Sequence, residues 1–260
     1  GDFIIGPPYA NAKELTPRPD VPKGKTFRLQ MSSTDSKFFP GIAKGLHTIV
    51  PYKRNLTVYV PAQYKAGEPI PFLIAQDSMT RGEAPTVLDN MIADKRIPVM
   101  AAIFIDSGGS DAQGSERGLE YDTMSGQYAE FVEAEVLPFV SKECGVVFTK
   151  DPNARITMGG SSGAACAFSM AWYHPDLYRR VISYSGTYVN QQWPPNGATI
   201  HGAWEYHEHL IPESKKKPLR IWMHVGEMDL RYKDDESTYH NWVLANNRMA
   251  AVLKVKKYPY

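Results

Sequence analysis

One short stretch places a serine between two glycines, with an apolar run before it and helix-forming residues after it. The sequence Gly159-Gly-Ser161-Ser-Gly163 has the form G-x-S-x-G. The run Ile156–Met158 is typical of a short buried strand, and Ala164–Trp172 favours a helix. A serine between such elements sits on a sharp turn, which requires residues without a Cβ two places away on each side. The stretch therefore predicts a nucleophile elbow with Ser161 as the nucleophile.

Two other interpretations of this stretch remain open. Ser162 is a rival nucleophile, although only Ser161 has glycine at both required places. Alternatively, the glycines serve only to pack a helix onto a sheet. If Ser161 is the nucleophile, the backbone N–H of Ser162 at the start of the helix can stabilise an oxyanion, and the loop Gln76–Met79 is expected to supply the second donor.

A serine nucleophile needs a base that accepts its proton and an acid that orients the base. Where a nucleophile elbow of this kind occurs, the acid comes after the serine in the chain, in the loop that follows a later strand. That loop is Gly226–Asp229, directly after the apolar run Leu219–Val225. Asp229 is the predicted acid. The alternatives are Glu227, Asp234 and Asp235, and Asp229 could instead cap a turn.

The base has no convincing candidate among the histidines of the chain. Only His240 follows Asp229, and it falls on a predicted helix, Thr238–Leu253, which suits a helix-surface residue. His224 falls within a predicted buried strand, where we expect a core residue. The sequence therefore predicts a nucleophile and an acid without a base.

The remaining elements must position these residues, and strands alternate with helices through the middle of the chain. This order predicts an α/β fold with a mainly parallel sheet and helices on both faces. Residues 1–25 hold five prolines and are expected to form an extended N-terminal extension, followed by one domain over residues 26–260. The predicted strands are Phe27–Met31, Asn55–Val60, Pro71–Ala75, Val99–Ile105 and Val181–Tyr184, and the further helices are Thr86–Asp94 and Gln127–Glu143.

The irregular segment 187–217 is dense in aromatic residues and is interpreted as a lid beside the site. Trp193, Trp204 and Tyr206 are its candidate substrate-binding residues, unless the segment buries its own aromatic side chains. The segment also contains three histidines, at positions 201, 207 and 209. A His-x-His spacing without a cysteine pair is weak evidence for a metal, so no metal site and no cofactor are expected.

Composition narrows the class of partner. A net charge of +1 gives no reason to expect binding to nucleic acid or to a membrane, and no apolar run approaches the length of a membrane span. The partner expected is a small-molecule ester, and the oligomeric state is not predicted. Cys166 is expected to be a small buried thiol and Cys144 to end a helix, with no requirement for a disulfide. The chain begins at Gly1, so any signal peptide would already have been removed.

Several motifs together resemble the putative esterase family of α/β-hydrolases, over about residues 50–255. The closest likeness is to enterochelin-esterase-like proteins, which are related to feruloyl and acetyl carbohydrate esterases. The motifs are Met158–Gly163, His174–Tyr178, Val181–Gly186, Glu120–Asp122 and Glu135–Pro138. The resemblance implies an α/β-hydrolase fold and a secreted or periplasmic location.

The resemblance also implies site residues. Ser161 would be the nucleophile, Asp229 the acid, and the amides of Ser162 and Met79 the oxyanion donors, with Ser78 standing where the family often has glycine. The family places its histidine after one more strand, which we expect beyond Tyr260 together with a C-terminal strand and helix. The expected activity is hydrolysis of an acyl or phenolic ester of a sugar or siderophore-like molecule through an acyl-enzyme. An acyltransferase or a non-catalytic binding protein on the same fold are the alternatives.

Overall fold

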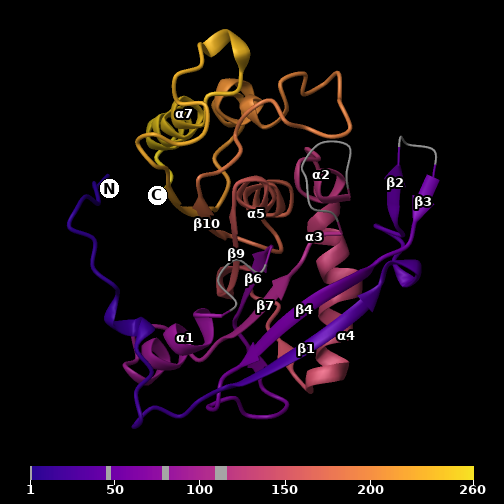
Figure 1. Cartoon of the computed structure of the whole chain (residues 1–260), viewed down its shortest axis with the longest axis vertical. Helices are drawn as coiled ribbons and strands as arrows, with labels where there is room; N and C mark the ends of the chain where they lie inside the picture. The colour runs from indigo at the N-terminus through magenta and orange to yellow at the C-terminus, as the bar shows by residue number, and fades with distance from the viewer. Residues whose placement is uncertain (1, 45–47, 78–81, 109–115) are drawn as a thin grey trace.

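A seven-stranded sheet forms the centre of the molecule (Figure 1). The computed structural model describes residues 2–44, 48–77, 82–108 and 116–260. The sheet order is β1-β4-β7-β6-β9-β10-β11, and the five strands from β7 to β11 run parallel, whereas β1 and β4 are antiparallel to their neighbours. The strands are β1 (Lys25–Ser32), β4 (Lys53–Val60), β6 (Phe72–Gln76), β7 (Ala101–Ile105), β9 (Arg155–Gly160), β10 (Arg180–Tyr184) and β11 (Arg220–His224).

The two faces of the sheet are buried by different helices. In β6, Phe72 and Ile74 join the larger core cluster, and Leu73 and Ala75 join the smaller one, because successive side chains of a strand point to opposite faces. The smaller cluster is covered by α1 (Ala84–Ala93), and the larger one by α3 (Gln127–Phe131), α4 (Leu137–Cys144), α5 (Ser162–Tyr173) and α7 (Trp242–Val255). The mainly parallel sheet with helices on both faces is therefore confirmed.

The remaining elements are short and lie around the sheet. They are α2 (Glu116–Tyr121), α6 (Ile211–Glu213), the paired strands β2 (Ile42–Lys44) with β3 (Thr48–Val50) and β5 (Pro69–Ile70) with β8 (Val147–Phe148), the 3₁₀ turns η1 (Lys13–Leu15), η2 (Ser33–Asp35), η4 (Pro152–Ala154), η5 (Gly202–Trp204) and η7 (Glu236–Thr238), and the π-helical turns η3 (Val132–Val136) and η6 (Tyr206–Leu210). The N-terminal extension lies against α1. There the side chain of Asn90 donates to the carbonyls of Glu14 and Thr16. Among the helices of the described ranges, none combines the length and apolarity that a membrane span needs.

A buried ion pair connects α2 to the sheet. Arg54 of β4 and Glu120 of α2 approach to 2.5 Å, with only 4% and 0% of their side chains exposed. The same guanidinium donates to the carbonyl of Asp106 at 2.8 Å. Charges removed from water need such matched partners, so this pair determines where α2 lies.

Two predicted element boundaries differ from the structure. The helix predicted over Thr238–Leu253 begins at Trp242, because Asn241 is its N-cap and accepts from the N–H of Leu244 at 2.9 Å. The predicted helix Gln127–Glu143 contains the π-helical turn η3 between α3 and α4. Cys144 ends α4 as predicted, with Gly145 in the left-handed conformation after it, and Cys166 is buried.

Candidate active site

Ser161 lies on the sharp turn between β9 and α5, as the sequence predicts. Its backbone has φ 55° and ψ −128°, a conformation that is strained for any residue with a Cβ. The turn is fixed by the N–H of Ser161, which donates to the carbonyl of Tyr184 at 3.0 Å. The side chain is exposed, and its Oγ lies 3.2 Å from Oγ1 of Thr187. A strained and exposed serine at this position has the geometry of a nucleophile.

Gly159 is needed for space, whereas Gly163 lies in a tight contact that small shifts could relieve. A Cβ on Gly159 would lie 2.2 Å from the carbonyl carbon and oxygen of Gly163, so the end of β9 packs directly on the first turn of α5. A Cβ on Gly163 would lie 3.1 Å from Cβ of Gln76 and 3.3 Å from Oδ2 of Asp77. The glycine spacing of the sequence therefore corresponds to a close approach between the backbone at the end of β9 and that of the first turn of α5.

Ser162 begins α5, and its backbone N–H is one of the groups that have no acceptor within the helix. The positive end of the helix dipole favours negative charge at this place. The side chain of Ser162 is buried, and its Oγ accepts from the amide of Gln191 at 3.2 Å. Burial raises the pKa of the neighbouring Asp122 to about 7, although hydrogen bonds with Ser162 and Gln191 oppose this shift. The residue after Ser161 is thus held rigidly, as an oxyanion donor must be.

Asp229 lies in the loop that follows β11. Its Oδ2 accepts from the hydroxyl of Ser185 at 2.5 Å and from the N–H of Gly226 at 3.3 Å, and its Oδ1 accepts from the N–H of Leu230 at 2.7 Å. Partial burial by itself would raise the pKa of Asp229, but these hydrogen bonds and the charge of His224 lower it overall. Asp229 is therefore an ionised carboxylate at the same edge of the sheet as Ser161.

The histidines occupy different environments from those predicted. His240 is not on a helix: it precedes the N-cap of α7, and its Nδ1 contacts the carbonyl of Thr238. His224 is not a core residue: it is the last residue of β11 and is exposed, with its ring stacked 6.4 Å from that of Trp222. Over residues 48–77, 82–108 and 116–260, no histidine side chain is hydrogen-bonded to Ser161 or Asp229.

The second oxyanion donor predicted, Met79, lies outside the described residues, as does Ser78. The residue at the entrance of that loop, Asp77, has a positive φ of 63° and donates its N–H to the carbonyl of Ile105 at 2.9 Å. Arg117 of α2 binds the Asp77 carboxylate at 2.8 Å. The loop that leads to position 79 therefore starts from an anchored residue.

The aromatic residues of segment 187–217 do not all face a site. Trp204 and Tyr206 are fully buried, and Tyr206 packs edge-on against Phe168 of α5 with ring centroids 4.8 Å apart. Their prediction as substrate-binding residues is corrected, because rings enclosed in the core offer no surface to a ligand. Trp193 keeps partial exposure, and its carbonyl accepts from Thr123 Oγ1 at 2.6 Å.

Four residues around the site were not identified from the sequence. They are Thr187 beside the nucleophile, Ser185 on the acid, and the pair Asp122 and Gln191 beside Ser162. The serine and threonine flank Gly186 directly after β10, the strand between the nucleophile and the acid. Residues that follow this middle strand must reach the same edge of the sheet, which is the signal that could have found them.

The sheet order and the elbow define the α/β-hydrolase class. The sequence over residues 48–259 matches the family described as "Putative esterase", so the chain belongs to this family. No curated protein matches the sequence.

Solved structures of esterases share this fold. An enterobactin esterase from Shigella flexneri, in the presence of enterobactin, superposes with a TM-score of 0.63 at 18% identity, over 94% of this chain and 54% of that chain. A ferulic acid esterase gives a TM-score of 0.61 at 17% identity, over 91% and 88%. A mutant feruloyl esterase module from Clostridium thermocellum, complexed with sinapinate, gives 0.56 at 15%, over 94% and 77%. The chain spans about half the length of the enterobactin esterases that it matches.

Proposed function

We propose that this chain is a serine carboxylic ester hydrolase that forms an acyl-enzyme on Ser161. The observation that carries the proposal is the strained, exposed Ser161 at the N-terminus of α5, with the ionised Asp229 at the same edge of the sheet. Attack by Ser161 Oγ on the ester carbonyl would produce an oxyanion beside the free N–H of Ser162. Collapse of this intermediate would break the ester C–O bond, release the protonated alcohol and leave the acyl group on Ser161; water would then release the acid from the acyl-enzyme.

The proposed base is a histidine beyond Tyr260, as the family resemblance implies. Asp229 supports this assignment because its carboxylate is already fixed by three donors and can orient an imidazole. Free imidazole in solution can replace a base that the described histidines do not supply. The rate of ester hydrolysis by this chain should therefore rise with imidazole concentration and saturate, if imidazole binds between Asp229 and Ser161.

The experiment is hydrolysis of 4-nitrophenyl acetate by the 260-residue chain, with and without imidazole. Ser161→Ala is the blank, because imidazole alone also cleaves this ester. Asp229→Asn should remove the saturation without removing the serine-dependent rate. If hydrolysis persists in Ser161→Ala but is lost in Ser162→Ala, the nucleophile is the rival serine and the proposal is wrong. Turnover only after an acceptor alcohol is added would indicate an acyltransferase.

The substrate class proposed is an acyl or phenolic ester of a sugar or siderophore-like small molecule. Support comes from the partly exposed ring of Trp193, two residues after Gln191, whose amide contacts Ser162. A flat phenolic group stacks well on an indole. We expect kcat/KM to be higher for a feruloyl ester than for a short aliphatic ester, and Trp193→Ala to reduce this preference. Equal rates on the two esters would contradict the substrate class while leaving the nucleophile intact.

A further inference from the structure

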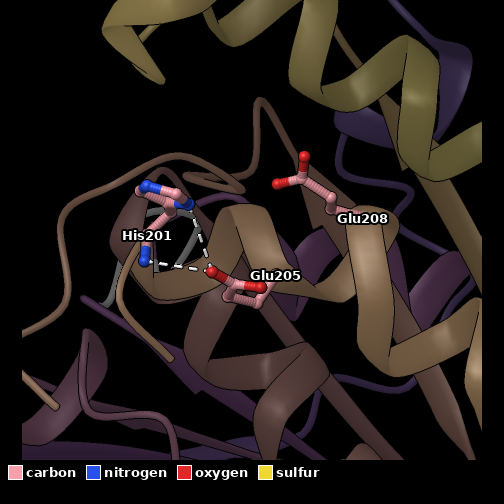
Figure 2. A group of neighbouring side chains, drawn as sticks. All are labelled: His201, Glu205 and Glu208. Carbon is pink, nitrogen blue, oxygen red and sulfur yellow. Dashed lines mark hydrogen bonds and ion pairs between the residues drawn. The ribbon is translucent and has the colours of Figure 1, made fainter. Parts of the chain in front are cut away.

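Segment 187–217 contains a group of ligand-type side chains that the proposed reaction does not use. His201, Glu205 and Glu208 each offer one ligand atom, and these atoms all lie within 4.8 Å of one another (Figure 2). His201 precedes the 3₁₀ turn η5, Glu205 follows it, and Glu208 lies on the π-helical turn η6. Such single π-turns are frequent at functional sites in helical proteins.

Glu205 is the centre of this group and has an unusual environment for a carboxylate. The residue is only 5% exposed. Its Oε1 accepts from the backbone N–H of His201 at 3.1 Å and faces Nδ1 of the same residue at 3.3 Å. Within the described ranges, its ion-pair partners are histidines and not lysine or arginine. A buried carboxylate without a permanent cation is costly, and a bound metal ion would supply that cation.

The spacing of the first two ligand atoms already suits a small metal ion. Bonds of about 2.0–2.1 Å in tetrahedral geometry place ligand atoms roughly 3.3 Å apart. The distance from His201 Nδ1 to Glu205 Oε1 is 3.3 Å. The ring of His201 is held in place by stacking on Tyr239, with centroids 3.7 Å apart and planes within 10°. These two ligands therefore need little movement to bind an ion.

The third ligand must move a short distance. Glu208 is exposed and has no dashed contact to the other two residues in Figure 2. An approach of roughly 1–2 Å would bring its carboxylate to ligand distance, and because the residue is exposed a change of rotamer can provide it. His209 lies near the opposite oxygen of Glu205, with Nε2 3.7 Å from Oε2, and is a further ligand within reach.

We propose that His201, Glu205 and Glu208 bind Zn²⁺. Imidazole together with carboxylates selects zinc and similar first-row ions over Mg²⁺ and Ca²⁺, which prefer oxygen ligands alone. The sequence directed attention to the His-x-His pair instead, but His207 is buried and its Nε2 contacts the carbonyl of Tyr188 at 3.3 Å. The ring of Tyr239 stacks on His201, and the backbone carbonyl of Tyr239 accepts from the N–H of Asn190 at 2.9 Å. The bound ion would therefore hold segment 187–217 against the loop after Asp229.

The test uses the full chain, freed of metal with a chelator and titrated with ZnCl₂ by calorimetry. We expect one ion per chain and a rise in Tm of roughly 5 °C at a hundredfold excess over Kd. Glu208→Gln changes an exposed residue that should not affect folding, and should weaken binding by at least about 10–100-fold, the loss typical of removing only an outer-shell partner, as should Glu205→Gln. The control is His174→Ala, since His174 also lies beside two carboxylates, at 3.2 and 3.6 Å, outside this group.

Two results would overturn the assignment. One is the absence of a one-to-one binding isotherm for the wild-type chain. The other is an isotherm that Glu208→Gln leaves unchanged or that His174→Ala removes. Replacement of zinc by Co²⁺ gives a second readout, because the visible absorption of Co²⁺ reports whether imidazole and carboxylates surround it in tetrahedral geometry.

Discussion

Replacing Gly159 by alanine tests the geometry of the elbow directly. The added Cβ would lie 2.2 Å from the carbonyl carbon and oxygen of Gly163 and 2.7 Å from the nitrogen of Ala164. All three are backbone atoms, so no change of rotamer relieves the overlap. Non-bonded carbon atoms pack at about 3.5–4.0 Å, so the first turn of α5 must move by roughly 1–1.5 Å away from β9.

The magnitude follows from this displacement. Over-packing typically costs 1–3 kcal/mol when side chains absorb the overlap, and here only backbone can move, so we expect the free energy of unfolding to fall by about 3 kcal/mol or more. The displacement also moves Ser161 and the N–H of Ser162 out of place, because both lie at the junction of β9 and α5. A misplacement of about 1 Å in a catalytic arrangement costs on the order of 100-fold in rate. Gly159→Ala should therefore lose both stability and serine-dependent hydrolysis.

Gly163→Ala is the matched control, because its Cβ would meet Gln76 and Asp77 at 3.1 and 3.3 Å, distances that small shifts can relieve. Alanine also favours a helix over glycine by about 1 kcal/mol, so the free energy of unfolding should change by less than about 1 kcal/mol. Urea unfolding followed by tryptophan fluorescence gives the stabilities, and the chromogenic acetyl ester gives the rates. If the two variants are equally stable, β9 and α5 do not approach as described and the reasoning fails.

Three further predictions concern strain and charge. Ser161→Gly removes a side chain from a φ of 55°, so it should abolish hydrolysis yet raise the free energy of unfolding by about 1 kcal/mol in urea. Burial raises the pKa of Asp122 from 3.8 to about 7, so the folded state binds its proton more tightly and wild-type stability falls as pH rises between these values. Asp122→Asn should remove about 2–4 kcal/mol of that fall, measured by urea unfolding at about pH 4 and about pH 8. Glu120→Gln leaves the Arg54 guanidinium buried without its counter-charge, and should lower the free energy of unfolding by about 3–5 kcal/mol.

The elbow could be predicted from sequence because its causes are local. The elbow spans only five consecutive residues, Gly159–Gly163. The close contact between Gly159 and Gly163 is between the end of a strand and the helix that directly follows it. The position of Asp229 was predictable for a related reason, since parallel strands bring their following loops to one edge. The burial of β6 on both faces likewise follows from its apolar run Phe72–Ala75, which is typical of such a strand.

The aromatic residues of segment 187–217 show where local reasoning fails. Nothing in their spacing tells a core residue from a ligand-binding one, because the segment has no regular period. The deciding contacts are distant in sequence: Tyr206 packs on Phe168, and its hydroxyl pairs with that of Ser169 at 2.6 Å. The interpretation of His224 failed in a similar way, since the end of an edge strand is exposed even when its middle is apolar.

The hydrogen bonds of Asp229 show whether its carboxylate could still bind a base, which the described histidines do not supply. A carboxylate has about four acceptor positions. Among the residues that the structure describes, three donors use these positions: the hydroxyl of Ser185 and the N–H groups of Gly226 and Leu230. Only one of these donors binds Oδ1, so this oxygen keeps a position for the N–H of an imidazole. The acid is thus ionised and fixed before a base binds, which lowers the entropy cost of orienting the base and makes rescue by free imidazole the most direct test of the proposed triad.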